Sequence, residues 1–271
     1  MRLINRRPDR TAMLALAMLP FALVILAYVL GSAARLAENP ADKLLPSLST
    51  LGDAIARTAF SPDARTGDYL LLNDTLASLD RLISALALST AIALVVGVLI
   101  GLLPAVRALL APFVAMVSMV PPLALLPILF IVMGLGETSK IALITIGVTP
   151  FLIRDLAMRV QELPREQIIK AETLGASSWQ IALRVVLPQI APRLIDAVRL
   201  SLGPAFLFLI AAEAIAAESG LGYRIFLVRR YLAMDVILPY VAWITLLSVI
   251  MDYALVRLRR AAFPWFGGRG A

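Results

Sequence analysis

Residues 162–188, ELPREQIIKAETLGASSWQIALRVVLP, are charged and punctuated by Gly and Pro inside an otherwise apolar chain. Of the 271 residues, 61% are hydrophobic and 16% are charged, and the mean hydropathy is +0.89. A single core in water cannot bury so much apolar surface. We therefore expect a membrane protein in which this stretch is a polar interruption between membrane spans.

The apolar stretches on both sides have the length of transmembrane helices, because about 20 apolar residues cross the ~30 Å of hydrocarbon in a bilayer. Three stretches carry no charge: 11–30, 82–106 and 108–136. Three more are shorter or interrupted by a charge: 139–158, 197–217 and 236–256. We predict an all-α, polytopic membrane protein with six transmembrane helices, and residues 75–258 as a core of five of them.

The basic residues cluster in three places that predict the topology. They are Arg2, Arg6, Arg7 and Arg10 before the first span; Arg154, Arg159, Arg165, Lys170, Arg184 and Arg193 between the fourth and fifth; and Arg257, Arg259, Arg260 and Arg269 after the last. Because positive residues stay in the cytoplasm, both tails (1–10 and 259–271) and the 154–193 segment are expected there. The more acidic loop 31–74 is expected outside. The net charge of +7 thus sets topology and does not indicate nucleic acid.

The N-terminal region allows a second interpretation. Residues 1–34 also fit a cleaved signal peptide, with a basic start, an apolar middle and a Ser-Ala-Ala end. The apolar run is longer than the ~7–15 residues usual in such peptides, so we expect a retained first helix. In the loop that follows, residues 48–59 have the spacing of an amphipathic helix lying on the outer membrane surface or against the bundle.

The residue types present limit the chemistry. The chain contains no Cys and no His, which removes thiolate chemistry, the commonest metal ligand and the usual proton carrier at neutral pH. It also lacks a G-x-x-x-x-G-K-[ST] loop, so we expect no ATP binding by this chain. We expect no catalytic residue, no metal and no cofactor of its own.

Gly and Pro mark two of the spans. Gly97 and Gly101 in the second span have a small-xxx-small spacing that favours close helix packing. In the third span Pro121, Pro122 and Pro127 each lack a backbone donor, and proline inside a helix kinks or breaks it. Freed carbonyls at membrane depth are tolerated against protein or a water-filled cavity. The third span is thus expected to border a translocation path or to be kinked for shape alone.

Local signals divide residues 162–188 into two short helices. Pro164 suits a first helical turn, and Gly175 is placed to end that helix in a left-handed conformation. Ser177 and Gln180 have the spacing of a capping box that begins the second helix, and Pro188 is expected to end it. The local pattern alone leaves open whether this pair folds back on its own bundle or contacts a partner.

The order of Gly175, nine residues and Val185-x-Leu187-Pro188 resembles the signature loop of the permeases of ATP-binding-cassette importers. Ala171 also fits that motif, whereas Ile169 and Lys170 replace its first two residues. "SLDRLISAL" and "AAEAIAAESGLGYRI" resemble, in order, the start of the second span and the stretch after the fifth in the nitrate, sulfonate and taurine type. The resemblance covers residues 44–260.

The resemblance implies that the chain is the membrane half of an importer in a prokaryotic inner membrane, usually as a homodimer, that takes up a small anionic solute of unreadable identity. A separate ATPase subunit would bind ATP and Mg²⁺ and receive residues 162–188 as a coupling helix, and an external solute-binding protein would deliver the solute. The residues expected to contact the ATPase are Ala171, Glu172, Gly175, Ala176, Ser177, Trp179, Leu183, Leu187 and Pro188.

The translocation path is expected on the third and fifth spans. The candidates are Ser118, Met119, Pro121, Pro122, Phe206, Phe208 and Glu213. Glu213 fits a structural or gating role or contact with solute, and Arg224 is a candidate partner for it. Asp252 is expected to pair with a following Arg. A secondary transporter driven by an ion gradient and an intramembrane enzyme are the alternatives, disfavoured by the lack of His and Cys.

Overall fold

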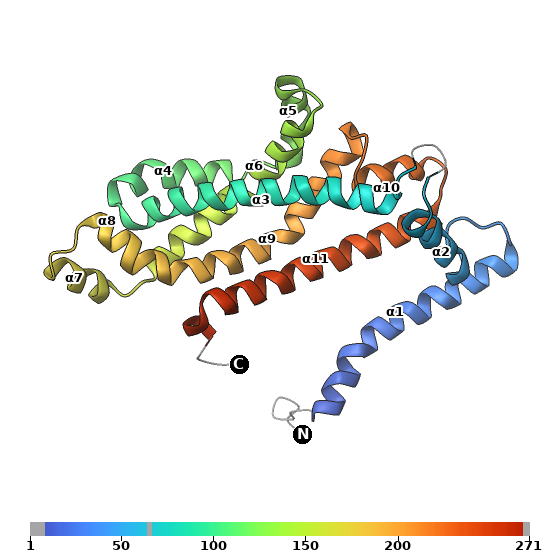
Figure 1. The fold of residues 1–271 in the computed structure, drawn as a ribbon, viewed down its shortest axis with the longest axis horizontal. Helices are drawn as coiled ribbons and strands as arrows, with labels where there is room; N and C mark the ends of the chain where they lie inside the picture. The colour runs from blue at the N-terminus through green and yellow to red at the C-terminus, as the bar shows by residue number, and fades with distance from the viewer. Residues whose placement is uncertain (1–8, 64–66, 268–271) are drawn as a thin grey trace. The chain divides into compact units, whose positions relative to one another are not determined.

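The computed structural model describes residues 9–63 and 67–267 and contains helices and no strand in these ranges (Figure 1). This confirms the predicted all-α class. Arg2, Arg6, Arg7 and Arg269, which supported the predicted topology, lie outside the described residues.

Five helices in the described part are long and apolar enough to cross a membrane. They are α1 (Arg10–Glu38), α3 (Leu70–Leu102), α6 (Glu137–Gln161), the run Ser178–Ala216 that includes α8 and α9, and α11 (Met234–Ala262). A sixth span is formed only if α4 (Pro104–Val117) is counted together with residues Pro122–Met133, which are bent from it by 81°.

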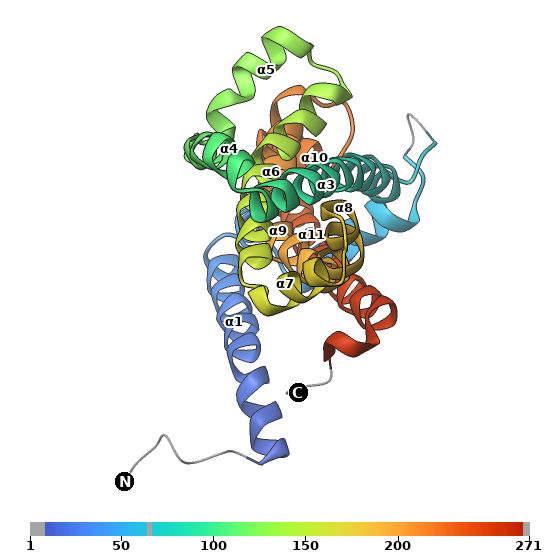
Figure 2. The same cartoon turned by 90° about the vertical axis from the view of Figure 1, so that its left-hand side faces the viewer.

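The proline effect expected in the span predicted over 108–136 is therefore confirmed, and it takes the form of a break in the helix. The chain leaves the helix at Ser118, continues through a 3-10 turn (Pro122–Leu125) and re-enters a helix as α5 (Leu126–Met133). Pro121 and Pro122 explain the break, because neither can donate the backbone hydrogen bond that would continue α4. Figure 1 shows α4 alongside α3, and Figure 2 shows α5 turning away from α4.

The chain divides into two compact units, residues 1–69 with 228–240, and residues 70–227 with 241–271. In the first unit, α1 is followed by α2 (Leu48–Ile55) and a π-helical turn (Ala56–Phe60), which confirms a helix near 48–59. Tyr28 donates a hydrogen bond to the carbonyl of Pro46 at 2.7 Å, which holds the connecting loop to α1. Arg35 donates to Asp42 at 2.5 Å, and this bond lowers the pKa of the Asp42 carboxyl below its usual value.

The second unit has its core where α3, α6 and α9 (Leu187–Ala216) pack together. Glycines allow this approach. A Cβ at Gly101 of α3 would lie 2.4 Å from the Cβ of Val160 on α6, and one at Gly97 would lie 3.0 Å from that of Leu156. A Cβ at Gly147 of α6 would likewise clash with the ring of Phe208 on α9. The predicted packing role of the small residues in α3 is confirmed.

The remaining helices of the described part are shorter. They are α7 (Arg165–Thr173), α8 (Ser178–Ile181), a π-helical turn (Ala182–Val186), α10 (Leu221–Arg229) and a 3-10 turn (Pro264–Gly267). α3 starts at Leu70, twelve residues before the predicted start at 82. The charged residues of this first part made it look too polar for a span, and the fold gives them partners that are described below.

We predict that Gly101→Ala destabilises the protein, because the added methyl group meets the branched carbon of Val160 rather than a movable side-chain end. Such overpacking costs about 1–3 kcal/mol. Thermal unfolding of the purified protein in detergent measures the change. Gly203→Ala in α9 is the matched control, since nothing lies within 4 Å of the new Cβ. Equal melting temperatures for the two variants would contradict the packing argument.

Candidate functional site

Residues 162–188, which we call the coupling segment after their predicted role, begin with α7 and a glycine turn. Gly175 has φ +82°, and the backbone N–H of Ala176 donates to the carbonyl of Ala171 at 3.0 Å. This is the helix-ending geometry that favours Gly, because a Cβ is strained at positive φ. The predicted stop at Gly175 is confirmed.

The second helix of the coupling segment starts as the sequence predicts. The Gln180 backbone N–H donates to Ser177 Oγ at 3.3 Å, and the Ser177 backbone N–H donates to Gln180 Oε1 at 2.8 Å. These reciprocal bonds form a capping box. The start of α8 is therefore fixed by residues that are neighbours in the sequence.

The predicted end at Pro188 is wrong. The helix continues from Ser178 to Ala216, because a π-helical turn over Ala182–Val186 leads directly into α9. The wider turn accommodates the proline, and Gln189 Nε2 donates to the carbonyl of Val185 at 2.8 Å. The second helix of the coupling segment and α9 therefore form one continuous helix, Ser178–Ala216.

The surface of the coupling segment carries exposed apolar side chains. Trp179 is 72% exposed, Leu174 is 80% exposed, and α7 has no buried residue. Between α8 and the end of α3 lies an apolar groove of about 330 Å³. Of the predicted contact residues, Trp179, Leu183 and Leu187 line this groove. Glu172, Gly175 and Ser177 are exposed, while Ala171, Ala176 and Pro188 are half-buried.

Glu213 lies near the end of α9, at the opposite end of the α3–α6–α9 core from the coupling segment, and is fully buried. Its carboxylate accepts from Arg81 Nη1 at 2.6 Å, from Ser78 Oγ at 2.7 Å and from the backbone N–H of Gly222 at 2.8 Å. The partner is Arg81 and not Arg224, which corrects the pairing considered from the sequence. Arg224 instead donates to Asp74 at 2.8 Å.

Further bonds extend this group into a charge cluster, which we define as Asp74, Ser78, Arg81, Glu137, Lys140, Glu213 and Arg224. Arg81 Nη2 donates to Glu137 at 3.0 Å, and Lys140 donates to the same carboxylate at 2.8 Å. Gly220 has φ +131°, and a Cβ there would lie 2.5 Å from the Glu213 carboxyl carbon. The cluster thus ties together the starts of α3 and α6 and the turn after α9.

Asp252 on α11 also has a different partner from the one expected. It accepts from Arg199 of α9 at 2.8 Å, whereas Arg259 pairs with Asp196 at 2.5 Å. The next arginine after Asp252 is Arg257, five residues on, and side chains five apart do not share a helix face. The cross-helix pair therefore forms instead.

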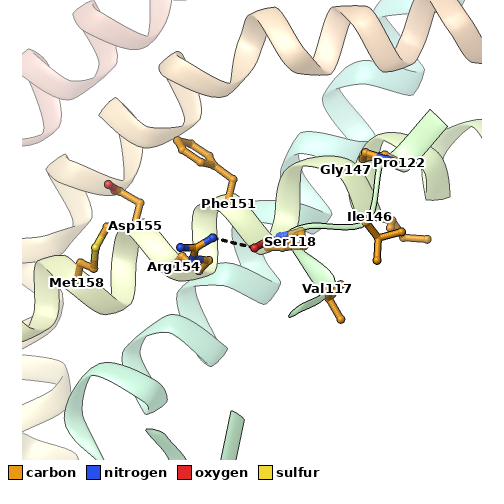
Figure 3. A pocket seen from close by; sticks show the side chains of 11 residues that line it. Val117, Ser118, Pro122, Ile146, Gly147, Phe151, Arg154, Asp155 and Met158 are labelled. Carbon is orange, nitrogen blue, oxygen red and sulfur yellow. Dashed lines mark hydrogen bonds between the residues drawn. The ribbon is translucent and has the colours of Figure 1, made fainter. Parts of the chain in front are cut away.

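A third feature is the break pocket, a cavity of about 310 Å³ beside the break after α4 (Figure 3). It is lined by Val117, Ser118, Val120, Pro122, Ile146, Gly147, Pro150, Phe151, Arg154, Asp155 and Met158. Arg154 of α6 donates to Ser118 Oγ at 2.8 Å, and Ser118 Oγ donates to the carbonyl of Ala115 at 2.7 Å. The pocket therefore combines an apolar wall with the guanidinium of Arg154, the carboxylate of Asp155 and the hydroxyl of Ser118.

The structure brings together only part of the predicted path. Ser118 and Pro122 share the break pocket, and Met119 is 78% exposed. Pro121 is exposed, and Phe206 and Phe208 are buried. Glu213 lies in the charge cluster. The role of these residues in transport stays a prediction.

Sequence reasoning missed the partners of Arg154, Arg81 and Ser78. Arg154 was used only to predict the membrane topology, although an ionisable residue within the predicted span 139–158 is itself a candidate functional residue. Ser78 and Arg81 were noted only as part of "SLDRLISAL". In the described ranges, no group of three or more Asp or Glu residues is arranged to hold a metal ion.

These features describe a multi-pass α-helical membrane protein with a capped helical pair between two of its spans. Residues 89–264 match the family described as "Binding-protein-dependent transport system inner membrane component". The chain belongs to this family and is a permease of the ABC-transporter type, which confirms the resemblance inferred from the sequence.

Two relatives show where in the family the chain falls. It is 36% identical over 200 residues to the taurine transport system permease protein TauC of Escherichia coli (strain K12), which covers 74% of this chain and 73% of the relative. It is 30% identical over 196 residues to the bicarbonate transport system permease protein CmpB of Synechococcus elongatus, covering 71% and 70%.

A solved structure supports the fold. A chain of the MetNI methionine ABC transporter, solved in inward-facing conformations, matches with a TM-score of 0.64 and 23% identity. The match covers 73% of this chain and 99% of that chain. At this identity the similarity establishes the shared helical arrangement and nothing further.

We predict that Glu213→Ala strongly destabilises the protein, because Arg81, Ser78 and the Gly222 N–H lose their buried acceptor. Removing one partner from a buried ion pair costs about 3–5 kcal/mol. Thermal unfolding in detergent tests this.

Glu162→Ala is the control, since this 52% exposed carboxylate pairs with Arg159 and Arg193 at the surface. Its loss should cost about 1 kcal/mol or less. If both variants unfold at the same temperature, the charge cluster does not hold the helix ends together.

Proposed function

We propose that this permease is the membrane-spanning subunit of an ATP-driven importer that carries a small, oxyanion-bearing solute into a prokaryotic cell across its inner membrane. The observation that carries the proposal is the exposed coupling segment, which projects between α6 and α9 within the region matching the family. A chain that needed this segment only for its own folding would bury its apolar side chains, whereas Trp179 and Leu174 are exposed.

The coupling segment suits the transfer of force from a separate ATPase subunit. Its first helix is stopped by Gly175 and its second is capped by Ser177, so both ends are fixed. Exposed apolar side chains at helical spacing, such as Trp179 and Leu183, match the recognition of a helix in an apolar groove. ATP and Mg²⁺ belong to the partner in this proposal, because this sequence has no phosphate-binding loop.

The direction and the remaining partners follow from the topology and the family. The basic residues around the coupling segment favour a cytoplasmic location for it, where the ATPase would bind. The family description includes a binding protein, and we propose that such a protein docks on the outer face. Apolar side chains of α5, including Ile131 at 84% exposed, supply surface for lipid or for a second copy of the chain, and we propose a homodimer.

The proposed solute class rests on the relatives. Taurine carries a sulfonate, and bicarbonate is itself an oxyanion, so the two named solutes share a compact group of negatively charged oxygens. We propose the same group on the solute of this permease.

We predict that Trp179→Ala weakens binding of the ATPase subunit about 30-fold, because truncating a tryptophan anchor at an interface costs about 2 kcal/mol or more. Co-purification from cells that express both subunits measures this. Trp265→Ala is the matched control, since Trp265 is 66% exposed and lies outside the coupling segment. Undiminished recovery of the ATPase with Trp179→Ala would contradict docking at this residue.

We predict that Gly175→Asp leaves the permease folded but lowers ATP-driven uptake at least about 10-fold, because it places an unpaired carboxylate in the docking surface. The backbone conformation accepts Asp at modest cost, and nothing lies within 4 Å of its Cβ. Gly175→Asn has the same shape without the charge and should retain more uptake. Equal uptake by Gly175→Asp and the unchanged protein, measured in proteoliposomes, would refute the docking assignment.

A further inference from the structure

The arginines of the second unit differ in what they bind. In the described part of this unit, six of the twelve arginines pair with carboxylates: Arg81, Arg159, Arg193, Arg199, Arg224 and Arg259. Arg107 donates to the carbonyl of Ile100 at 3.0 Å, and Arg257 donates to the hydroxyl of Tyr253. In the part of the chain that the structure describes, Arg154 donates to one neutral hydroxyl, that of Ser118. Arg154 lies in the last part of α6 and its side chain is exposed, so a guanidinium that no carboxylate neutralises is accessible to an anion.

The nearest acidic side chain does not neutralise Arg154. Asp155 also lines the break pocket, but its carboxylate is directed to Arg159 at 3.5 Å. Figure 3 shows the Asp155 carboxylate pointing away from the Arg154 guanidinium, which extends toward Ser118. Arg154 therefore keeps N–H donors in a fixed planar arrangement that fits two oxygens of an oxyanion.

Ser118 positions this guanidinium without competing for an anion. Its hydroxyl proton is directed to the carbonyl of Ala115, so its lone pair is free to accept from Arg154. An acid at this position would neutralise the arginine. The break at Pro121 and Pro122 ends α4 at this point and leaves Ser118 facing α6.

We propose that Arg154, held by Ser118, is the residue that binds the oxyanion of the transported solute in the break pocket. The identity of the solute class rests on the proposed function. The pocket of about 310 Å³ has the space of roughly ten water molecules, enough for a short alkanesulfonate. A lipid phosphate offers the same chemistry, but the side chain folds back to Ser118 within a pocket formed by two elements, which favours a free solute.

The first test measures binding of an oxyanion to Arg154 in the permease without its partner subunits. Purified full-length protein in lipid-free detergent is treated with phenylglyoxal, and modification of each arginine is followed by mass spectrometry in ethanesulfonate or in chloride at equal ionic strength. Arg154 should react several-fold more slowly in ethanesulfonate. Arg199 is the internal control, because its guanidinium is already paired with Asp252 and Asp196. Equal reaction rates of Arg154 in both salts would overturn the proposal.

A second arm separates the solute from lipid. The same measurement is made in nanodiscs of phosphatidylglycerol. If this lipid protects Arg154 and ethanesulfonate adds nothing in either setting, the residue is a lipid anchor and the proposal is wrong. Protection by ethanesulfonate in detergent and in nanodiscs supports it.

The third measurement uses the assembled transporter, with its ATPase and binding protein, in proteoliposomes and taurine as the probe. Arg154→Gln should lower uptake about 10-fold or more, the effect of losing a hydrogen bond to a charged group, with the melting temperature unchanged. Arg154→Lys should recover part of the loss, and Ser118→Ala should have a smaller effect. Uptake by Arg154→Gln equal to that of the unchanged transporter would overturn the proposal.

The experiments distinguish failure of the proposed function from failure of the Arg154 proposal. If the unchanged transporter shows no ATP-driven uptake of taurine, bicarbonate or ethanesulfonate, the proposed function is contradicted. The protection of Arg154 in the permease alone still decides whether the break pocket binds an oxyanion.

Discussion

Hydrocarbon offers no hydrogen bonds, so each polar group in the membrane-spanning part of this permease must find its partner within the protein or in a wet cavity. The buried carboxylate of Glu213 meets this constraint with three donors from two segments far apart in the sequence. At the break after α4, the N–H groups of Met119 and Val120 donate to the carbonyls of Met116 and Val117, and Ser118 Oγ donates to the carbonyl of Ala115. Local bonds thus satisfy these groups where the regular helix ends.

The close approach of α3 and α6 makes these arrangements possible. Gly97 and Gly101 let the two helices touch, and at the far end of the pair Arg81 reaches Glu137 and Glu213. If α3 and α6 lay farther apart, the Arg81 guanidinium could not reach the Glu137 carboxylate. Helix packing at one end and ion pairing at the other are therefore parts of one geometry.

What could be predicted from the sequence depended on the range of the interactions. Ser177 and Gln180 are three residues apart, and Gly175 ends its own helix, so local signals sufficed to predict the turn. Glu213 and Arg81 are 132 residues apart, and only the fold brings them together. The start of α3 looked too polar for a span for the same reason, because the partners of Asp74 and Arg81 are distant in the sequence. The break in the third span was expected as a proline effect, but its 81° bend depends on packing that proline alone does not specify.

The error at Pro188 changes how the coupling segment relates to the rest of the protein. A helix that ended there would leave a hinge between the coupling segment and the fifth span. Instead, Ser178–Ala216 is one run of 39 residues, about 58 Å long at 1.5 Å per residue, with the exposed Trp179 near one end and Glu213 near the other.

In the proposed importer, a displacement of α8 by the ATPase subunit would therefore act on a continuous helix whose other end is held by the charge cluster. The π-helical turn over Ala182–Val186 is where this helix departs from regular α-helix, and its extra residue lets it bend without losing continuity. The second helix of the coupling segment is thus joined by continuous helix to the residues around Glu213.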